Sequence, residues 1–230
     1  MTLYPHVYKS LRYDPLHEFI PVTTVSAAPS LLTIGPMVPE SVKTLADFIA
    51  WCRANPRQAT YGSPGAGTSP HFIGVQLGRT AGFEYTHVPY QGNAPAALDV
   101  LGGQIASSVV TIDTTLPYIL SGHIRALATT GPSRSTFLPD VPTFIESGYP
   151  TIELVDLWAA FAPARTPVEI VDRLDNSMQE ALKSDQVKVG LRKLSIEVSA
   201  VSREDFARLM HSDFERWRSV VQASGFTPQD

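Results

Sequence analysis

Short apolar and β-branched stretches alternate with stretches of helical periodicity along most of the chain. Short apolar runs bounded by Gly, Pro or charge indicate buried strands, whereas apolar side chains every three or four residues indicate helices. This alternation predicts an α/β fold with mainly parallel strands, because parallel neighbours need a crossover between them. Seven strands, enough for two small sheets, are predicted at residues 20–25, 31–35, 59–62, 84–88, 105–111, 124–130 and 157–162.

Three helix starts carry a hydroxyl residue followed three positions later by a carboxylate, which is the capping-box pattern. The pairs are Thr44 with Asp47, Thr166 with Glu169, and Ser202 with Asp205. Pro167 stands in the first turn of the second helix, where its missing N–H costs nothing. The third helix is predicted to end near Gly225 and to bury one apolar side, formed by Phe206, Leu209, Met210, Phe214, Trp217, Val220 and Val221.

Two stretches interrupt the alternation and are candidates for connections between two lobes. Residues 131–150 contain four prolines and predict an extended surface segment. The stretch AAPSL at 27–31 separates two of the predicted strands. Two connections of this kind form a hinge in proteins that close around a ligand.

The stretch YGSPGAGTSPHFIG at 61–74 is a glycine-rich loop that runs into a predicted helix. The first N–H groups of a helix have no internal partner and attract anions. A triphosphate loop needs a lysine after its last glycine, but Thr68 and Ser69 follow Gly67. The dinucleotide pattern fails as well, because Pro70 stands where a third small residue is needed. The loop therefore favours a carboxylate; the alternative is that Gly65 and Gly67 only turn the chain.

Composition narrows the partners further. The chain has 230 residues, of which 43% are apolar and 17% charged, as in folded globular proteins. A net charge of −4 gives no basic excess, so we expect no nucleic-acid partner. Apolar runs stay well below the roughly 18 residues that cross a bilayer. The single cysteine, Cys52, is expected to fill the core, and the first ten residues lack the pattern of a signal peptide.

Catalytic and metal-binding patterns are weak. The six histidines show no HExxH or HxH spacing, and Ser63 lies in GSPG instead of a GxSxG elbow. We therefore expect no catalytic residue, no metal ion and no cofactor, although a dispersed hydrolase triad stays a third, weaker reading. His71, in the first turn after the loop, is a candidate either for ligand contact or for a structural hydrogen bond.

Five phrases together resemble the Bug-type receptors, the solute-binding components of tripartite tricarboxylate transporters. They are YDPLHEFIPVT (13–23), SPGAGTSPHF (63–72), HVPYQGNAPAALDVLGGQ (87–104), RALATTGPSRS (125–135) and LPDVPTFIESG (138–148). The resemblance implies a periplasmic binding protein with two α/β lobes of the Venus flytrap, type II-like kind. It implies that the chain captures di-, tri- or aromatic carboxylates and delivers them to membrane permease subunits.

By this resemblance the first lobe spans 1–31 and 154–230, and the second lobe spans 32–153. The resemblance also implies ligand contacts from the loop and from the segment that begins at Tyr90. The matching residues of this sequence are Ser63, Gly65, Gly67, Thr68, Ser69, Tyr90, Gln91 and Gly92.

Two departures from the family pattern bear on function. Family members begin with a signal peptide, an opening strand and a second glycine-bearing loop, so the first lobe is expected to be incomplete here. The alternative reading is therefore a truncated or repurposed receptor that acts as an intracellular sensor or interaction protein. After GGQ, Ala106 and Val110 replace polar or acidic residues, which favours a more apolar acid. Thr111, Asp113 and Thr114 keep polar groups at the end of the predicted strand.

Overall fold

The computed structural model describes all 230 residues, which divide into two compact units. Unit 1 comprises Met1–Ala28 and Asp156–Asp230, and unit 2 comprises Pro29–Val155. The chain therefore passes between the units twice. Residues 131–150 lie inside unit 2 and do not join the units, contrary to the expectation from their prolines.

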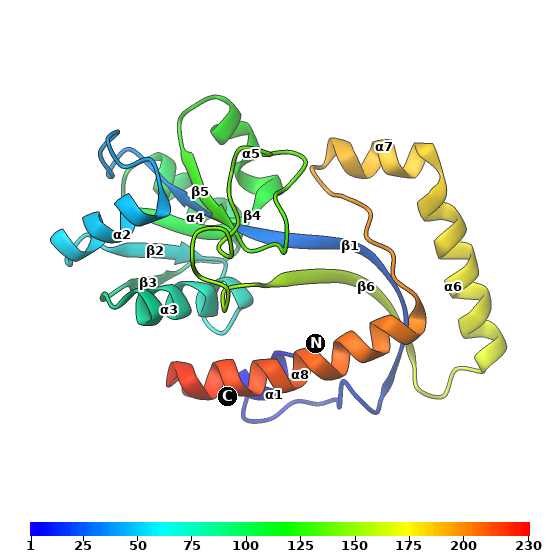
Figure 1. The fold of residues 1–230 in the computed structure, drawn as a ribbon. Coiled ribbons are helices and arrows are strands. Elements are labelled where there is room, and N and C mark those ends of the chain that lie inside the picture. Colours follow the sequence, from blue (N-terminus) through cyan, green and yellow to red (C-terminus); the bar gives the residue numbers. More distant parts are fainter. The chain divides into compact units, whose positions relative to one another are not determined.

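Unit 2 is built on the strands β2 (Thr60–Ser63), β3 (Thr86–Pro89), β4 (Ser107–Thr111) and β5 (Arg125–Thr129), and on the part of β1 (Phe19–Ile34) that follows Ala28. Their order is β3-β2-β4-β1-β5 (Figure 1). Strand β2 runs parallel to both β3 and β4, as expected. Strand β1 runs antiparallel to β4 and β5, so the sheet is mixed. The prediction of mainly parallel strands was wrong for β1, which enters unit 2 directly without a helical crossover.

One strand replaces two of those predicted, and the structure has six strands in one sheet instead of seven in two. Residues 27–31 continue β1 as extended chain, and the chain passes from unit 1 to unit 2 within them, after Ala28, so the predicted crossing lies inside one strand instead of between two strands. Pro29 fits there because its fixed φ suits an extended backbone. The ladder between β1 and β4 begins one residue later, with Ser30 opposite Thr111, so the missing N–H of Pro29 costs no bond in that ladder.

Helices α2 (Leu45–Ala54), α3 (Ser69–Ala81), α4 (Asn93–Leu101) and α5 (Ile112–Leu120) complete unit 2. The predicted capping box at α2 is confirmed: Thr44 accepts the N–H of Asp47, and the Asp47 carboxylate accepts the N–H of Thr44. Helix α3 lies very close to β2, because an added Cβ at Gly74 would stand 2.1 Å from the Tyr61 ring. Tyr61 is fully buried and its hydroxyl donates to the carbonyl of His71, which fixes the start of α3 against β2.

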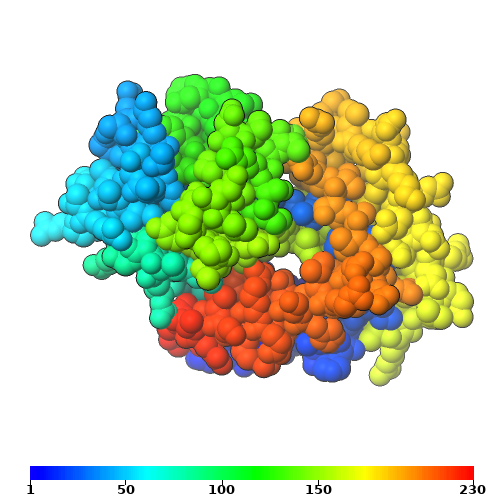
Figure 2. Space-filling model, viewed as in Figure 1, coloured from blue at the N-terminus to red at the C-terminus, as the bar shows by residue number.

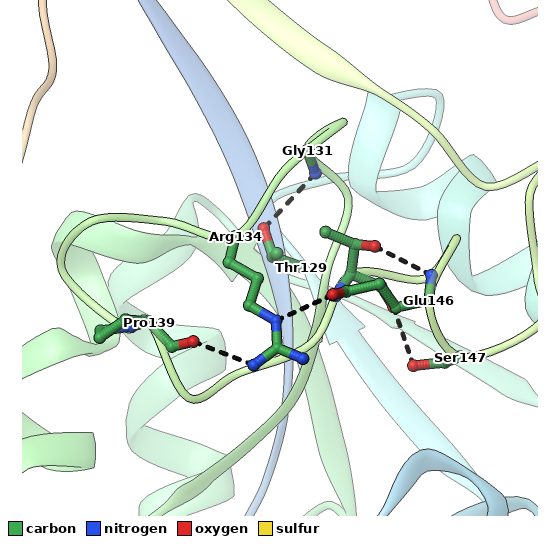
Figure 3. A network of polar contacts seen from close by, with 7 residues as sticks. Thr129, Gly131, Arg134, Pro139, Glu146 and Ser147 are labelled. Atoms are coloured by element: carbon green, nitrogen blue, oxygen red, sulfur yellow. Dashed lines mark hydrogen bonds and ion pairs between the residues drawn. The ribbon is translucent and has the colours of Figure 1, made fainter.

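The proline-rich segment is held against β5 by a polar network (Figure 3). The Arg134 Nε donates to both carboxylate oxygens of Glu146 at 3.0 Å, and Glu146 in turn accepts the N–H of Thr143. Thr143 pairs with Thr129 in a parallel bridge, which attaches this segment to the strand. Figure 2 shows the segment in yellow-green on the surface of unit 2.

Unit 1 contains β6 (Val155–Pro163), which pairs with β1, and the helices α1 (Tyr4–Val7), α6 (Val168–Lys183), α7 (Asp185–Lys193) and α8 (Arg203–Ser224). Val22 of β1, Ala162 of β6 and Val171 of α6 form one buried cluster. On α8, the predicted N-cap Ser202 and the stop at Gly225 are both confirmed, and Phe206, Met210, Trp217 and Val221 are buried. Leu209 is 44% exposed, so the apolar side of α8 is narrower than predicted.

The predicted capping box at α6 was wrong. Pro167 has an extended ψ of 140° and is itself the N-cap, without a capping hydrogen bond from a side chain. The helix therefore begins at Val168, one residue later than the pattern requires, and Thr166 lies outside the capping position. The N–H of Thr166 instead donates to the carbonyl of Pro163 in a turn.

Candidate functional site

Three helices of unit 2 begin at the same edge of the sheet. Strand β2 leads through the glycine loop into α3, β3 leads through residues 90–92 into α4, and β4 leads directly into α5. Because β2 runs parallel to both β3 and β4, the carboxyl ends of these strands meet at one edge. The chain leaves β2 toward β3 but leaves β4 toward β5, so the edge between β2 and β4 is a topological switch point. Ligands of open α/β sheets bind at such points.

Hydrogen bonds within the glycine loop fix its shape. Gly67 has a φ of 74° and its N–H donates to His71 Nδ1 at 3.2 Å. The Thr68 hydroxyl donates to the carbonyl of Gly65 at 2.7 Å, and the N–H of Gly65 makes a long 3.4 Å contact with Ser63 Oγ. The N–H groups of Gly65 and Gly67 are thus already in use, which differs from the expectation that the glycines supply open donors.

Two other main-chain N–H groups of the loop stay open. Neither Ala66 nor Thr68 donates its main-chain N–H to an acceptor within the protein. Ala66 is exposed and Thr68 is the N-cap of α3, so both groups lie where the positive end of the helix dipole attracts anions. Ser69, the first residue of α3, is buried. No Lys or Arg occurs in residues 63–69, 90–93 or 111–114.

The segment after β3 is tied to the loop through its main chain. The N–H of Tyr90 donates to the carbonyl of Ser63, and the N–H of Gly92 donates to the carbonyl of Pro64, both at 3.0 Å. The Tyr90 side chain instead donates to Asp99 Oδ2 at 2.7 Å and packs on the core of α4. Burial, followed by the Asp99 carboxylate, raises the pKa of Tyr90 above its usual value. Tyr90 therefore supports the loop mainly through its backbone, and Gln91 is exposed.

The residues predicted after β4 have different environments. Thr111 Oγ1 accepts a hydrogen bond from Asn93 Nδ2 at 3.0 Å, which links the starts of α4 and α5. Asp113 is exposed in the first turn of α5, where its carboxylate stabilises the helix, and Thr114 is half-buried beside it. Ala106 and Val110, the apolar replacements, are fully buried in the core.

Sequence reasoning missed Asn93. Its Oδ1 is buried and has no hydrogen-bond partner, although buried polar atoms normally have one. Because N and O of an amide are assigned from the hydrogen-bond network, the unpartnered atom is either an acceptor or, with the amide turned over, a donor. A signal was available: Asn93 directly follows Gly92, the last residue of the segment that the family resemblance places at the ligand.

Sequence reasoning also missed His87. The Ser63 Oγ lies 2.7 Å from His87 Nε2, which is the spacing of a serine nucleophile and its base. Ser63 is fully buried, however, and the neighbour of His87 is His71 instead of an orienting carboxylate. Burial, followed by the proximity of His71, lowers the pKa of His87 to about 4. This pair therefore does not support the hydrolase alternative.

Other chemistry finds little support. The structure has no group of three or more His, Cys, Asp or Glu side chains placed to hold a metal ion. Cys52 is buried, as predicted, and burial raises the pKa of its thiol to about 12. None of the helices combines the length and apolar composition needed to cross a membrane.

Comparison with known proteins identifies relatives of this chain along nearly its whole length. The sequence profile described as "Tripartite tricarboxylate transporter family receptor" matches residues 1–226. Protein BugT of Bordetella pertussis is 29% identical over 216 residues, which cover 94% of this chain and 66% of BugT. The chain spans about two thirds of the length of the curated relatives that it matches.

Two solved structures hold an organic acid. Rpa4515 of R. palustris with adipate has a TM-score of 0.86 and 32% identity, covering 97% of this chain and 74% of Rpa4515. MatC of Rhodopseudomonas palustris with bound malate has a TM-score of 0.80 and 26% identity, covering 94% of this chain and 74% of MatC. Both likenesses extend over nearly the whole chain, so the mixed α/β fold is that of these binding proteins.

Proposed function

Because the chain belongs to the tripartite tricarboxylate transporter receptor family, we propose that it binds small organic carboxylates through the edge formed by β2, β3 and β4. The observation that carries the proposal is the pair of open N–H groups of Ala66 and Thr68 at the start of α3. Thr111, Thr114, Ser69 and Asn93 supply further polar groups along this edge. The proteins that hold adipate and malate add support, since both ligands are dicarboxylates.

The binding energy follows from the donors. A hydrogen bond from a neutral donor to a carboxylate contributes roughly 1.5–3 kcal/mol after desolvation. Two such bonds together with the field of the α3 dipole give a gross interaction of roughly 4–7 kcal/mol, so the dissociation constant cannot fall below about 10 μM from these donors alone, because the freedom lost on association is still to be subtracted. No metal ion or cationic side chain is needed. The exposed Asp113 carboxylate would repel the anion, which favours an acid held nearer to α3 than to α5.

In the cell, we propose, the protein is a periplasmic receptor that passes its ligand to the membrane permease subunits of a tripartite transporter. Support comes from the family and from the likeness to the periplasmic binding protein BugD, which has a TM-score of 0.86 at 27% identity. Reading the in-frame DNA upstream of Met1 tests the location. An in-frame export signal upstream is the expected result. An in-frame stop codon with no export signal between it and Met1 would favour the intracellular alternative.

The binding proposal is tested with a thermal-shift screen against adipate, malate, citrate and benzoate, followed by calorimetry on any acid that stabilises the protein. Stabilisation by at least one of these acids at millimolar concentration is expected. Stabilisation by none of them would contradict carboxylate binding by this chain.

A matched pair of variants then tests the role of the loop N–H groups. Thr68→Ala and Thr68→Pro both remove the hydroxyl that donates to Gly65, but only proline also removes the main-chain N–H. The φ of Thr68, −91°, is close to the range that proline adopts. Thr68→Pro should bind the acid about 10-fold more weakly than Thr68→Ala, or weaker still. Equal affinities of the two folded variants would show that this N–H does not hold the ligand.

A further inference from the structure

Two histidines whose rings contact each other at a tilt lie against the glycine loop. His71 belongs to the first turn of α3 and His87 to β3, and their ring centroids are 4.1 Å apart at an interplanar angle of 30°. His71 holds the second half of the loop through Gly67, and His87 holds its beginning through Ser63. The pair thus contacts both ends of the segment that carries the open N–H groups of Ala66 and Thr68.

The direction of one bond defines the state of His71. The N–H of Gly67 can only donate, so His71 Nδ1 must carry a lone pair, and the proton of the neutral ring stands on Nε2. Protonation of Nδ1 would set two donors against each other. The Ser63 Oγ is within 2.7 Å of His87 Nε2, and either atom can donate there.

We infer that His71 and His87 are positioning residues that, as a neutral pair, hold the glycine loop in the conformation that leaves the N–H groups of Ala66 and Thr68 open for a ligand. The inference rests on the proposed carboxylate site for its functional part. Its structural part, the neutral pair holding the loop, stands on the contacts alone. Glycine adopts positive and negative φ about equally well, so steric preference alone does not fix the φ of 74° at Gly67, and the bond to His71 can do so.

The surroundings of the pair disfavour a charge. From β2, the Tyr61 ring lies 5.0 Å from the His87 ring, and its hydroxyl donates to the carbonyl of His71. Just before β3, the Tyr85 ring packs at a tilt against Tyr61, and its hydroxyl contacts Ser107 Oγ of β4. The titratable groups around the pair are therefore two tyrosines, which are neutral, and no carboxylate compensates a proton. Burial accordingly lowers the pKa of His71 and of His87 to about 4.

The structural part is tested first, on the ligand-free protein, by nitrogen-15 NMR. Long-range spectra of the histidine rings should show the Nε2–H tautomer of His71 at pH 7, and the Gly67 amide should be protected from exchange. On lowering the pH from 6 to 4, the Gly67 amide signal should move together with the His71 ring signals. An Nδ1–H tautomer, or a His71 ring that titrates near pH 6.5 while Gly67 stays unchanged, would overturn the inference.

The functional part is tested with matched substitutions at position 71. His71→Asn keeps an acceptor near the place of Nδ1, whereas His71→Leu keeps the bulk and removes the acceptor. With the acid found in the thermal-shift screen, His71→Asn should bind within about 3-fold of the wild type, and His71→Leu should bind at least about 10-fold more weakly. Equal loss in both folded variants would show that only packing matters at this position.

Substitutions at His87 test the inference independently if a variant at position 71 fails to fold. If His71→Leu does not fold, His87→Gln and His87→Leu give the same comparison at the other end of the loop, since glutamine can reach the place of Nε2. His87→Gln should retain binding and His87→Leu should lose about 10-fold; equal affinities would overturn the inference. If the wild type binds none of the acids, the proposed function fails, while the NMR experiment still decides whether the pair holds the loop.

Discussion

Gly92 offers a sharp test of how the glycine loop is supported. It has a φ of 109° and a ψ of 176°, a combination that only glycine adopts without strain. An added Cβ at this position would meet no atom within 4 Å, so Gly92→Ala changes the backbone energy and not the packing. The N–H of Gly92 donates to the carbonyl of Pro64, so any relaxation of the backbone strain moves the loop.

The expected loss of stability follows from the backbone strain and from the hydrogen bond to Pro64. Strain in this backbone conformation costs about 1–3 kcal/mol; a partial relaxation leaves part of that strain and adds up to about 1 kcal/mol, because it weakens the hydrogen bond to Pro64. We expect Gly92→Ala to lower the free energy of unfolding by about 2–3 kcal/mol. Gly122→Ala is the matched control, because Gly122 has an ordinary left-handed φ of 76° and equally open space around its Cβ. That change should cost only about 1 kcal/mol.

Urea denaturation measures both differences, and amide hydrogen exchange locates them. Gly92→Ala should accelerate exchange of the Tyr90 and Gly67 amides, whereas Gly122→Ala should leave both unchanged. The reasoning is refuted if the two variants lose the same stability, or if exchange in the loop is unaffected by Gly92→Ala.

Three further outcomes follow from the structure. Arg125 donates to the carbonyls of Val38 and Pro39 at 2.7 and 3.1 Å, so Arg125→Met should cost roughly 2–3 kcal/mol in denaturant unfolding, and a loss below 0.5 kcal/mol would contradict this role. Cys52 should react with a thiol reagent such as Ellman's only after unfolding; rapid labelling of the native protein would show that it is accessible. The pKa of His71 and of His87 is about 4 in the folded protein and about 6.5 in the unfolded chain. Their neutral state therefore stabilises the fold fully above pH 6.5, and this stabilisation is lost as the pH falls toward 4. The free energy of unfolding falls by at most about 1.4 kcal/mol per pH unit for each histidine. Denaturation of His71→Asn between pH 7 and 4 should show a shallower slope than the wild type, and identical slopes would argue against this linkage.

Several helix ends could be predicted because each depends on neighbours in the sequence. The Thr44 capping box, the stop of α8 at Gly225 and the start of α3 after Thr68 all involve residues within a few positions of one another. The antiparallel course of β1 was missed because pairing is a contact between distant residues, and its apolar pattern fits either direction. The same limit explains why the interruption expected at 27–31 is continuous strand.

Part of the candidate site could be predicted from the sequence and part could not. The glycine loop and the helix behind it are recognisable from composition alone. Which N–H groups stay open is not, because the sequence does not tell that the His71 ring turns back onto the Gly67 amide. Asn93 and His87 were missed because their partners, Thr111 and Ser63, are 18 and 24 residues away along the chain.

By itself, the sequence determined the α/β class, the start of α2, both ends of α8, the family likeness and a loop that favours an anion without a cation. These properties are local: they follow from side-chain periodicity, turn chemistry and the absence of Lys and Arg near the loop. Only the tertiary structure decided the direction of β1, the meeting of three helix starts at one edge, and the occupation of the Gly65 and Gly67 amides. The first two features depend on which distant strands pair. The third depends on where the Ser63 and His71 side chains point, because a hydrogen bond can be assigned only when both of its partners have been placed in space.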